Sequence, residues 1–153
     1  MSTPKRLLFA GFIVGTLDII AACTQYYLKT GKGPEGVLKF VASGLFGKDA
    51  FTDGKSMIVA GLVIHFLIAM TFTFIFFLLV KNIGLLRENR LVTGLLYGAC
   101  VWVVMNKLVL PLTKAPALKH DTSASLQAMA ILIVCVGLPL AFLLIPRQQS
   151  TIY

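Results

Sequence analysis

Four long apolar blocks dominate the chain, and short polar segments separate them. The blocks cover residues 7–28, 56–80, 91–112 and 124–145. A helix needs about 20 residues to cross the roughly 30 Å hydrocarbon core of a bilayer, and each block is long enough. Backbone in lipid must satisfy its own hydrogen bonds, and the blocks are too long for barrel strands, so we expect helices. The pattern predicts an all-α integral membrane protein, a four-transmembrane-helix bundle that forms a single membrane domain over 1–153.

The segment between the first two blocks is predicted to hold a short amphipathic helix. Pro34 stands at a plausible first helical position. Apolar residues then recur at helical spacing, at Val37, Leu38, Val41 and Leu45. A helix over 34–46 is too short to span, so we expect it at the membrane interface or against the bundle.

Composition agrees with lipid as the solvent of this chain. Of its 153 residues 58% are hydrophobic and only 13% are charged, against about 25% charged in soluble domains. The net charge of +8 does not indicate nucleic-acid binding, because lysines and arginines lie between the apolar blocks and form no basic face interleaved with aromatic residues. There they would meet phospholipid headgroups. The first block is too long for a signal peptide and lacks a cleavage site, so we expect it to be retained.

Orientation follows weakly from charge, because the two sides carry similar numbers of basic residues. Lys5 and Arg6 directly precede the first block. All four arginines fall on that same side, at Arg6, Arg87, Arg90 and Arg147. The first span usually decides orientation, so we expect both termini in the cytoplasm.

One acidic residue and one histidine fall inside the apolar blocks at similar depth. Asp18 lies ten residues before Leu28, about 15 Å along a helix, and His65 lies nine residues after Ser56. We predict an Asp18–His65 hydrogen bond or ion pair. Two interpretations stay open: the pair fixes the register of the two helices, or it forms a proton- or cation-coupling site. By depth, Cys100 or Cys135 could join it.

Small residues mark the predicted helix contacts. Gly11 and Gly15 share a stripe with Asp18, Ala22 and Gln25, and we expect this stripe to face the second block. One turn before His65, Gly61 would let those two helices approach. A second G-x-x-x-G, Gly94 and Gly98, is expected to pack on the first block or to form a homodimer contact.

The third block adds Asn106, which completes a candidate intramembrane polar site of Asp18, His65 and Asn106. By residue counting Asn106 lies nearer the outer end of its block than Asp18 does in the first. Pro111 is expected to end the third block, and Pro139 to kink the fourth.

Signatures of catalysis are missing from the sequence. It contains no H-E-x-x-H, no glycine-rich phosphate loop and no G-x-S-x-G, and its three cysteines are isolated. We therefore predict no catalytic residue, no metal site and no cofactor.

Several short motifs together resemble the uncharacterised bacterial inner-membrane family represented by YagU, a domain of unknown function. The motifs are Gly15-Thr-Leu-Asp18, Ala42-Ser-Gly-Leu-Phe-Gly47, Ala50-Phe51, His65-Phe66, Gly94-Leu-Leu-Tyr-Gly98, Met105-Asn106, Leu110-Pro111 and Val136-Gly137-Leu-Pro139. The resemblance implies a multi-span protein of the bacterial inner membrane and brings no established activity.

Three functions remain open at this point. The first is a non-enzymatic structural or accessory membrane protein, which the absence of catalytic motifs and the helix-contact stripes favour. The second is a protomer of an oligomeric proton- or cation-coupled transporter or channel that uses Asp18. The third is an intramembrane enzyme acting on a lipid-soluble substrate, for which Asp18, His65 and Asn106 would have to converge.

Overall fold

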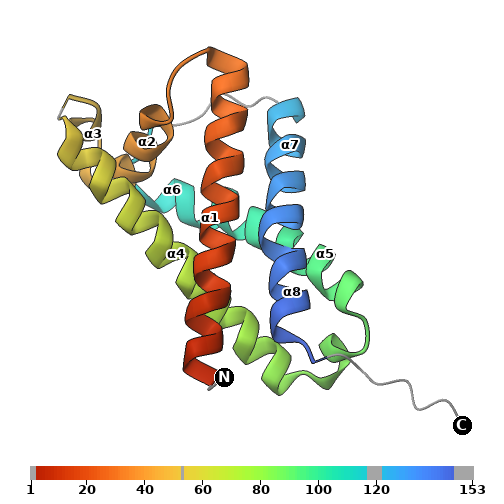
Figure 1. The fold of residues 1–153 in the computed structure, drawn as a ribbon. Coiled ribbons are helices and arrows are strands. Elements are labelled where there is room, and N and C mark those ends of the chain that lie inside the picture. Colours follow the sequence, from red (N-terminus) through yellow and green to blue (C-terminus); the bar gives the residue numbers. More distant parts are fainter. Residues whose placement is uncertain (1–2, 53, 117–121, 147–153) are drawn as a thin grey trace, which may run out of the picture.

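Helices account for all regular structure in the described part of the chain, residues 3–52, 54–116 and 122–146 of a computed structural model (Figure 1). Four of them are long and apolar enough to cross a membrane: Thr3–Thr30, Lys55–Asn82, Arg90–Leu112 and Thr122–Leu144. This confirms the predicted all-α, four-span fold. The spans extend up to four residues beyond the predicted blocks, because polar residues at the ends continue the helices.

The first span is α1 (Thr3–Thr30) and the second is α4 (Lys55–Asn82). Each of the other two contains a π-helical segment. The third span consists of α5 (Arg90–Val103), η2 (Val104–Val109) and α6 (Leu110–Leu112). The fourth consists of α7 (Thr122–Leu132), η3 (Ile133–Gly137) and α8 (Leu138–Leu144). A 3₁₀ helix, η1 (Gly84–Arg87), joins α4 to α5.

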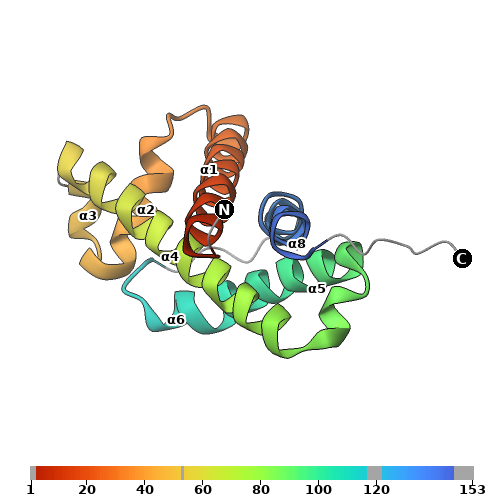
Figure 2. The same ribbon diagram turned by 60° about the horizontal axis from the view of Figure 1, so that its bottom comes forward.

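The four spans do not form a regular parallel bundle. The first and fourth spans run side by side in opposite directions, and Figure 2 shows α1 and α8 nearly end-on. In the same view α4 and α5 run across the page. The start of α1 and the end of α8 therefore lie at the same end of the molecule (Figure 1).

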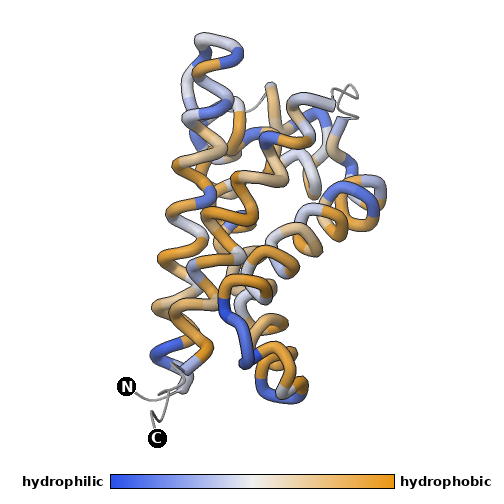
Figure 3. Tube along the Cα trace, turned by 90° about the vertical axis from the view of Figure 1, so that its right-hand side faces the viewer, coloured by the Kyte–Doolittle hydropathy of each residue, from blue (hydrophilic) through white to orange (hydrophobic). Residues whose placement is uncertain are grey.

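The buried core lies towards that end and joins all four spans. Its members are Ala10, Val14, Phe76, Val80, Tyr97, Val101, Val136, Leu140, Ala141, Leu144 and Ile145. The Tyr97 hydroxyl donates a hydrogen bond of 2.6 Å to the Phe72 carbonyl. The rings of Tyr97 and Phe76 pack edge to face, with their centroids 4.7 Å apart. Figure 3 shows that apolar residues dominate along the four spans. Many large apolar side chains on these spans are exposed, which suits helices surrounded by lipid.

The predicted amphipathic helix is α2 (Glu35–Phe46), followed by the short α3 (Asp49–Thr52). Ala42 and Ser43 on α2 are fully buried, so the helix is packed into the bundle. Gly61 of α4 lies directly against the backbone carbonyl of Leu38. This corrects the prediction for Gly61: its missing side chain makes room for α2 and not for the first span.

Gly11 and Gly15 lie against α4, the second span, as predicted from the sequence. The neighbours of Gly11 are Met70 and Thr73. A Cβ on Gly15 would come within 2.9 Å of the Phe66 ring and 3.2 Å of the Ala69 methyl. These glycines let α1 and α4 approach closely, as small residues do in membrane helix pairs.

Gly94 and Gly98 face the fourth span, so the predicted packing on the first span is wrong. A Cβ on Gly98 would lie 2.5 Å from the Ile133 Cα. Gly137 meets the backbone of both glycines, through the Gly94 carbonyl and the Gly98 amide. Gly94, Gly98 and Gly137 thus form one backbone-to-backbone crossing between the third and fourth spans.

A proline follows each π-helical segment closely. Pro111 and Pro139 are the second residues of α6 and α8. Proline cannot donate a backbone hydrogen bond, and its ring clashes with the carbonyl four residues before it. The helix widens there: Leu110 donates to the Met105 carbonyl and Leu138 to the Ile133 carbonyl, each five residues back. The expected disturbance at Pro139 is therefore a π-helical turn.

A candidate intramembrane polar site

His65 connects the first two spans through a backbone hydrogen bond. It is 9% exposed, and its Nε2 lies 2.9 Å from the carbonyl oxygen of Gly15. A carbonyl oxygen can only accept, so Nε2 carries the hydrogen. Gly15 thus lets α4 approach α1 closely, and its carbonyl accepts the hydrogen bond from His65.

Asp18 lies one turn after Gly15 and interacts with His65 through its charge. The carboxylate is partly buried and feels the imidazole electrostatically. Yet within the described residues no hydrogen bond or ion pair joins the two side chains. This corrects the predicted direct pair: depth counting placed the residues at one level, but the imidazole bonds the backbone of α1.

The third member of the cluster comes from the fourth span. The thiol of Cys135, inside η3, also interacts with the charge of Asp18. Of the two cysteines that depth selected, Cys100 is exposed on the outside of α5. Activated cysteines lie in positively charged surroundings, whereas the charge that Cys135 feels is that of a carboxylate. The cluster therefore lacks the arrangement of a cysteine nucleophile with its base.

Asn106 is used within its own helix. Its side-chain amide donates to the Trp102 carbonyl, one turn back, at 2.9 Å. It lies in η2, next to Lys107, which is exposed. In the described structure no hydrogen bond links Asn106 to Asp18 or His65, so the three predicted site residues do not converge.

A polar seam runs between the first and fourth spans, with Asp18 in its middle. Near one end, the Arg6 guanidinium donates to the Leu143 carbonyl at 2.9 and 2.5 Å. Near the other end, the Gln25 amide donates to Gln127 at 3.2 Å. The two spans run antiparallel, so this register carries Cys135 to Asp18. The contacts of Arg6 with Leu143 and of Gln127 with Gln25 were not predicted from the sequence. The position of Gln25 in the stripe of the first span was the one available signal.

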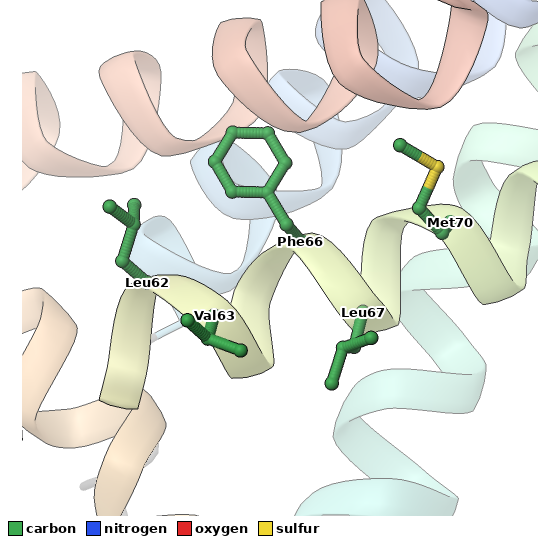
Figure 4. A pocket seen from close by; sticks show the side chains of 5 residues that line it. All are labelled: Leu62, Val63, Phe66, Leu67 and Met70. Carbon is green, nitrogen blue, oxygen red and sulfur yellow. The ribbon is translucent and has the colours of Figure 1, made fainter. Parts of the chain in front are cut away.

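A shallow hollow of about 290 Å³ lies on the outer side of α4 and is apolar. It is lined by Leu62, Val63, Phe66, Leu67 and Met70. In Figure 4 the Phe66 ring points towards α1, where it stacks on Phe12 at 5.4 Å, while Leu67 lies on the other side of the helix. Such a surface suits acyl chains, and it provides no polar group for chemistry.

No group of three or more His, Cys, Asp or Glu side chains that could hold a metal ion occurs among the described residues. Comparison with known proteins adds no assignment: no family model, no curated protein and no solved structure matches this chain. The arrangement of Asp18, His65 and Cys135 is therefore the basis for a functional proposal.

Proposed function

We propose that this chain is a protomer of a proton- or cation-coupled membrane transporter or channel, with Asp18 as its coupling site. The observation that carries the proposal is the carboxylate itself. It lies inside a span, and among the described residues it accepts no hydrogen bond. A charged group at the bilayer centre costs a few kcal/mol, so an acid kept there without a structural bond favours a functional role.

The alternative role for Asp18, to fix the register of two helices, has lost its main support. The Gly11 and Gly15 contacts with α4 and the His65 bond to Gly15 already hold the first two spans together. None of these contacts uses the Asp18 side chain. A carboxylate that takes no part in these contacts remains available to bind a proton or a cation.

His65 suits the role of an electrostatic partner to this acid. The hydrogen bond from Nε2 to the Gly15 carbonyl holds the imidazole ring in place, one turn from the carboxylate along the first span.

A single copy of four spans is too small to enclose a pathway, so the proposal includes a homo-oligomer in the lipid bilayer. We place it in the bacterial inner membrane with both termini cytoplasmic. Lys5 and Arg6 before the first span and the resemblance to the YagU family support this placement. We expect neither a catalytic activity nor a cofactor or metal.

Proton flux in liposomes tests the proposal. Protein reconstituted into vesicles that contain a pH-sensitive dye should dissipate a pH gradient, and Asp18→Asn should abolish this flux. Asp49→Asn is the matched control, because it removes one exposed carboxylate outside the spans. Normal flux in the Asp18→Asn variant would refute Asp18 as the coupling site.

A second candidate is a structural or accessory membrane protein. The backbone crossing of Gly94, Gly98 and Gly137 favours it, because so close a contact restricts movement of the third span against the fourth. Wild-type vesicles that show no more flux than protein-free vesicles would favour this candidate.

A further inference from the structure

The element formed by α2 and α3 is anchored by its backbone, so its outer face is fixed in place. The backbone of Leu38 lies against Gly61 of α4. A Cβ on Gly36 would lie 2.5 Å from the Tyr26 hydroxyl oxygen of α1, so these two residues are also in close contact. The backbone amide of Lys114, just after α6, donates to the Gly44 carbonyl at 3.0 Å. Three spans therefore support this element from the inside.

Its outer face carries three exposed large apolar side chains. Leu45 is 61% exposed, Phe46 45% and Phe51 43%, although neighbouring Ala42, Ser43 and Ala50 are fully buried. The element connects the first two spans and so lies at a boundary of the hydrocarbon core. Large apolar side chains at that level reach into the acyl region of a leaflet.

Lys114, from the end of the third span, lies against the glycine that precedes Lys48. A Cβ built on Gly47 would lie 3.7 Å from Cβ and 4.0 Å from Cδ of Lys114, so the Lys114 stem crosses Gly47. Lys48 follows Gly47 directly, and both lysines are exposed. Gly47 has a φ of +66°, which favours glycine, and this keeps the crossing point free of a side chain.

Charge at this end is mainly positive and unpaired. Among the described residues near α2 and α3, six lysines face two acids: Lys29, Lys32, Lys39, Lys48, Lys55 and Lys114 against Glu35 and Asp49. No lysine ammonium in the described structure donates a hydrogen bond or joins an ion pair. At the opposite end, Arg6 and Arg87 donate to backbone carbonyls of Leu143, Val80 and Lys81.

We propose that Lys48 and Lys114 bind the headgroup phosphate of an anionic phospholipid, while Leu45 and Phe46 contact its acyl chains. The charge of the lysine pair is complementary to that headgroup, and the adjoining apolar face selects a lipid over a free anion. This site is independent of Asp18 and of the transport proposal.

Native mass spectrometry of the detergent-solubilised protein tests this site. The probes are phosphatidylglycerol and phosphatidylcholine with identical acyl chains. Wild-type protein should retain phosphatidylglycerol in preference. In the double variant Lys48→Gln/Lys114→Gln, the ratio of retained phosphatidylglycerol to retained phosphatidylcholine should fall by about fivefold for each lysine removed.

The matched control is Lys5→Gln/Lys81→Gln, which removes the same charge at the other end of the molecule and should keep the preference. Phe46→Ser should lower retention of both lipids by a similar factor, because its contact is with the acyl chains. An unchanged preference in the Lys48/Lys114 variant, or an equal loss in the control, would overturn the proposal. Unfolding midpoints without added lipid verify that the variants are folded.

Discussion

The Nε2 of His65 lies 2.9 Å from the carbonyl oxygen of Gly15, a glycine that lets the first two spans approach closely. A small residue and a buried polar side chain thus act at one position. The glycine admits the second helix, and its carbonyl accepts a hydrogen bond from the imidazole of that helix. Asp18, one turn further, stays outside this bond.

The first prediction concerns this hydrogen bond. His65→Ala removes a buried ring and its donor, and we expect a loss of about 2–4 kcal/mol, the range for large-to-small changes in a packed interior. His65→Gln retains an N–H donor and should recover part of the loss. Thermal unfolding in detergent measures both, with the lipid-facing Leu67→Ala, at a position 62% exposed, as the control. Equal midpoints for His65→Ala and Leu67→Ala would mean that the Gly15 bond contributes nothing.

The second prediction concerns the crossing of the third and fourth spans. Gly98→Ala places a methyl group 2.5 Å from the Ile133 Cα, and backbone cannot give way as a side chain can. We expect a destabilisation of about 1–3 kcal/mol. Gly84→Ala is the matched control, because nothing lies within 4 Å of its Cβ position and the variant should be neutral or slightly more stable. A neutral Gly98→Ala would contradict the close crossing.

The third prediction concerns α2. Gly61→Ala would push a methyl group into the Leu38 carbonyl and should lift α2 from the bundle. Limited proteolysis detects this release as faster cleavage of the segment between α1 and α4. The cleavage rate should rise by about an order of magnitude for each 1.4 kcal/mol by which the docking of α2 is weakened. Cleavage at the wild-type rate would show that α2 does not depend on this contact.

The sequence was sufficient to predict the four spans, because the length of an apolar block is a property of the chain alone. It also placed Asp18, His65 and Cys135 at one depth, since each residue adds a fixed rise along a helix. Depth does not determine which way a side chain faces around the helix. For this reason the partner of His65 was predicted as Asp18 when it is the Gly15 carbonyl.

The same limit explains the errors at the glycines. Gly61, Gly94 and Gly98 were correctly placed on close contacts, but the neighbours proved to be α2 and the fourth span. Those neighbours depend on the tilt of α4 and α5, which no local pattern records. The π-helical turns were also beyond prediction, because a proline disturbs a helix in several ways and the surrounding packing selects one.

The thermal unfolding midpoint of Asp18→Asn, measured in detergent at neutral pH, shows whether this carboxylate holds the fold together. His65 and the glycines join the first two spans, and the Asp18 carboxylate makes no structural bond among the described residues. We expect Asp18→Asn to unfold at or above the wild-type midpoint, because an amide is less costly than a carboxylate in an apolar interior. A midpoint lowered as far as that of His65→Ala would contradict the account and assign Asp18 a structural role.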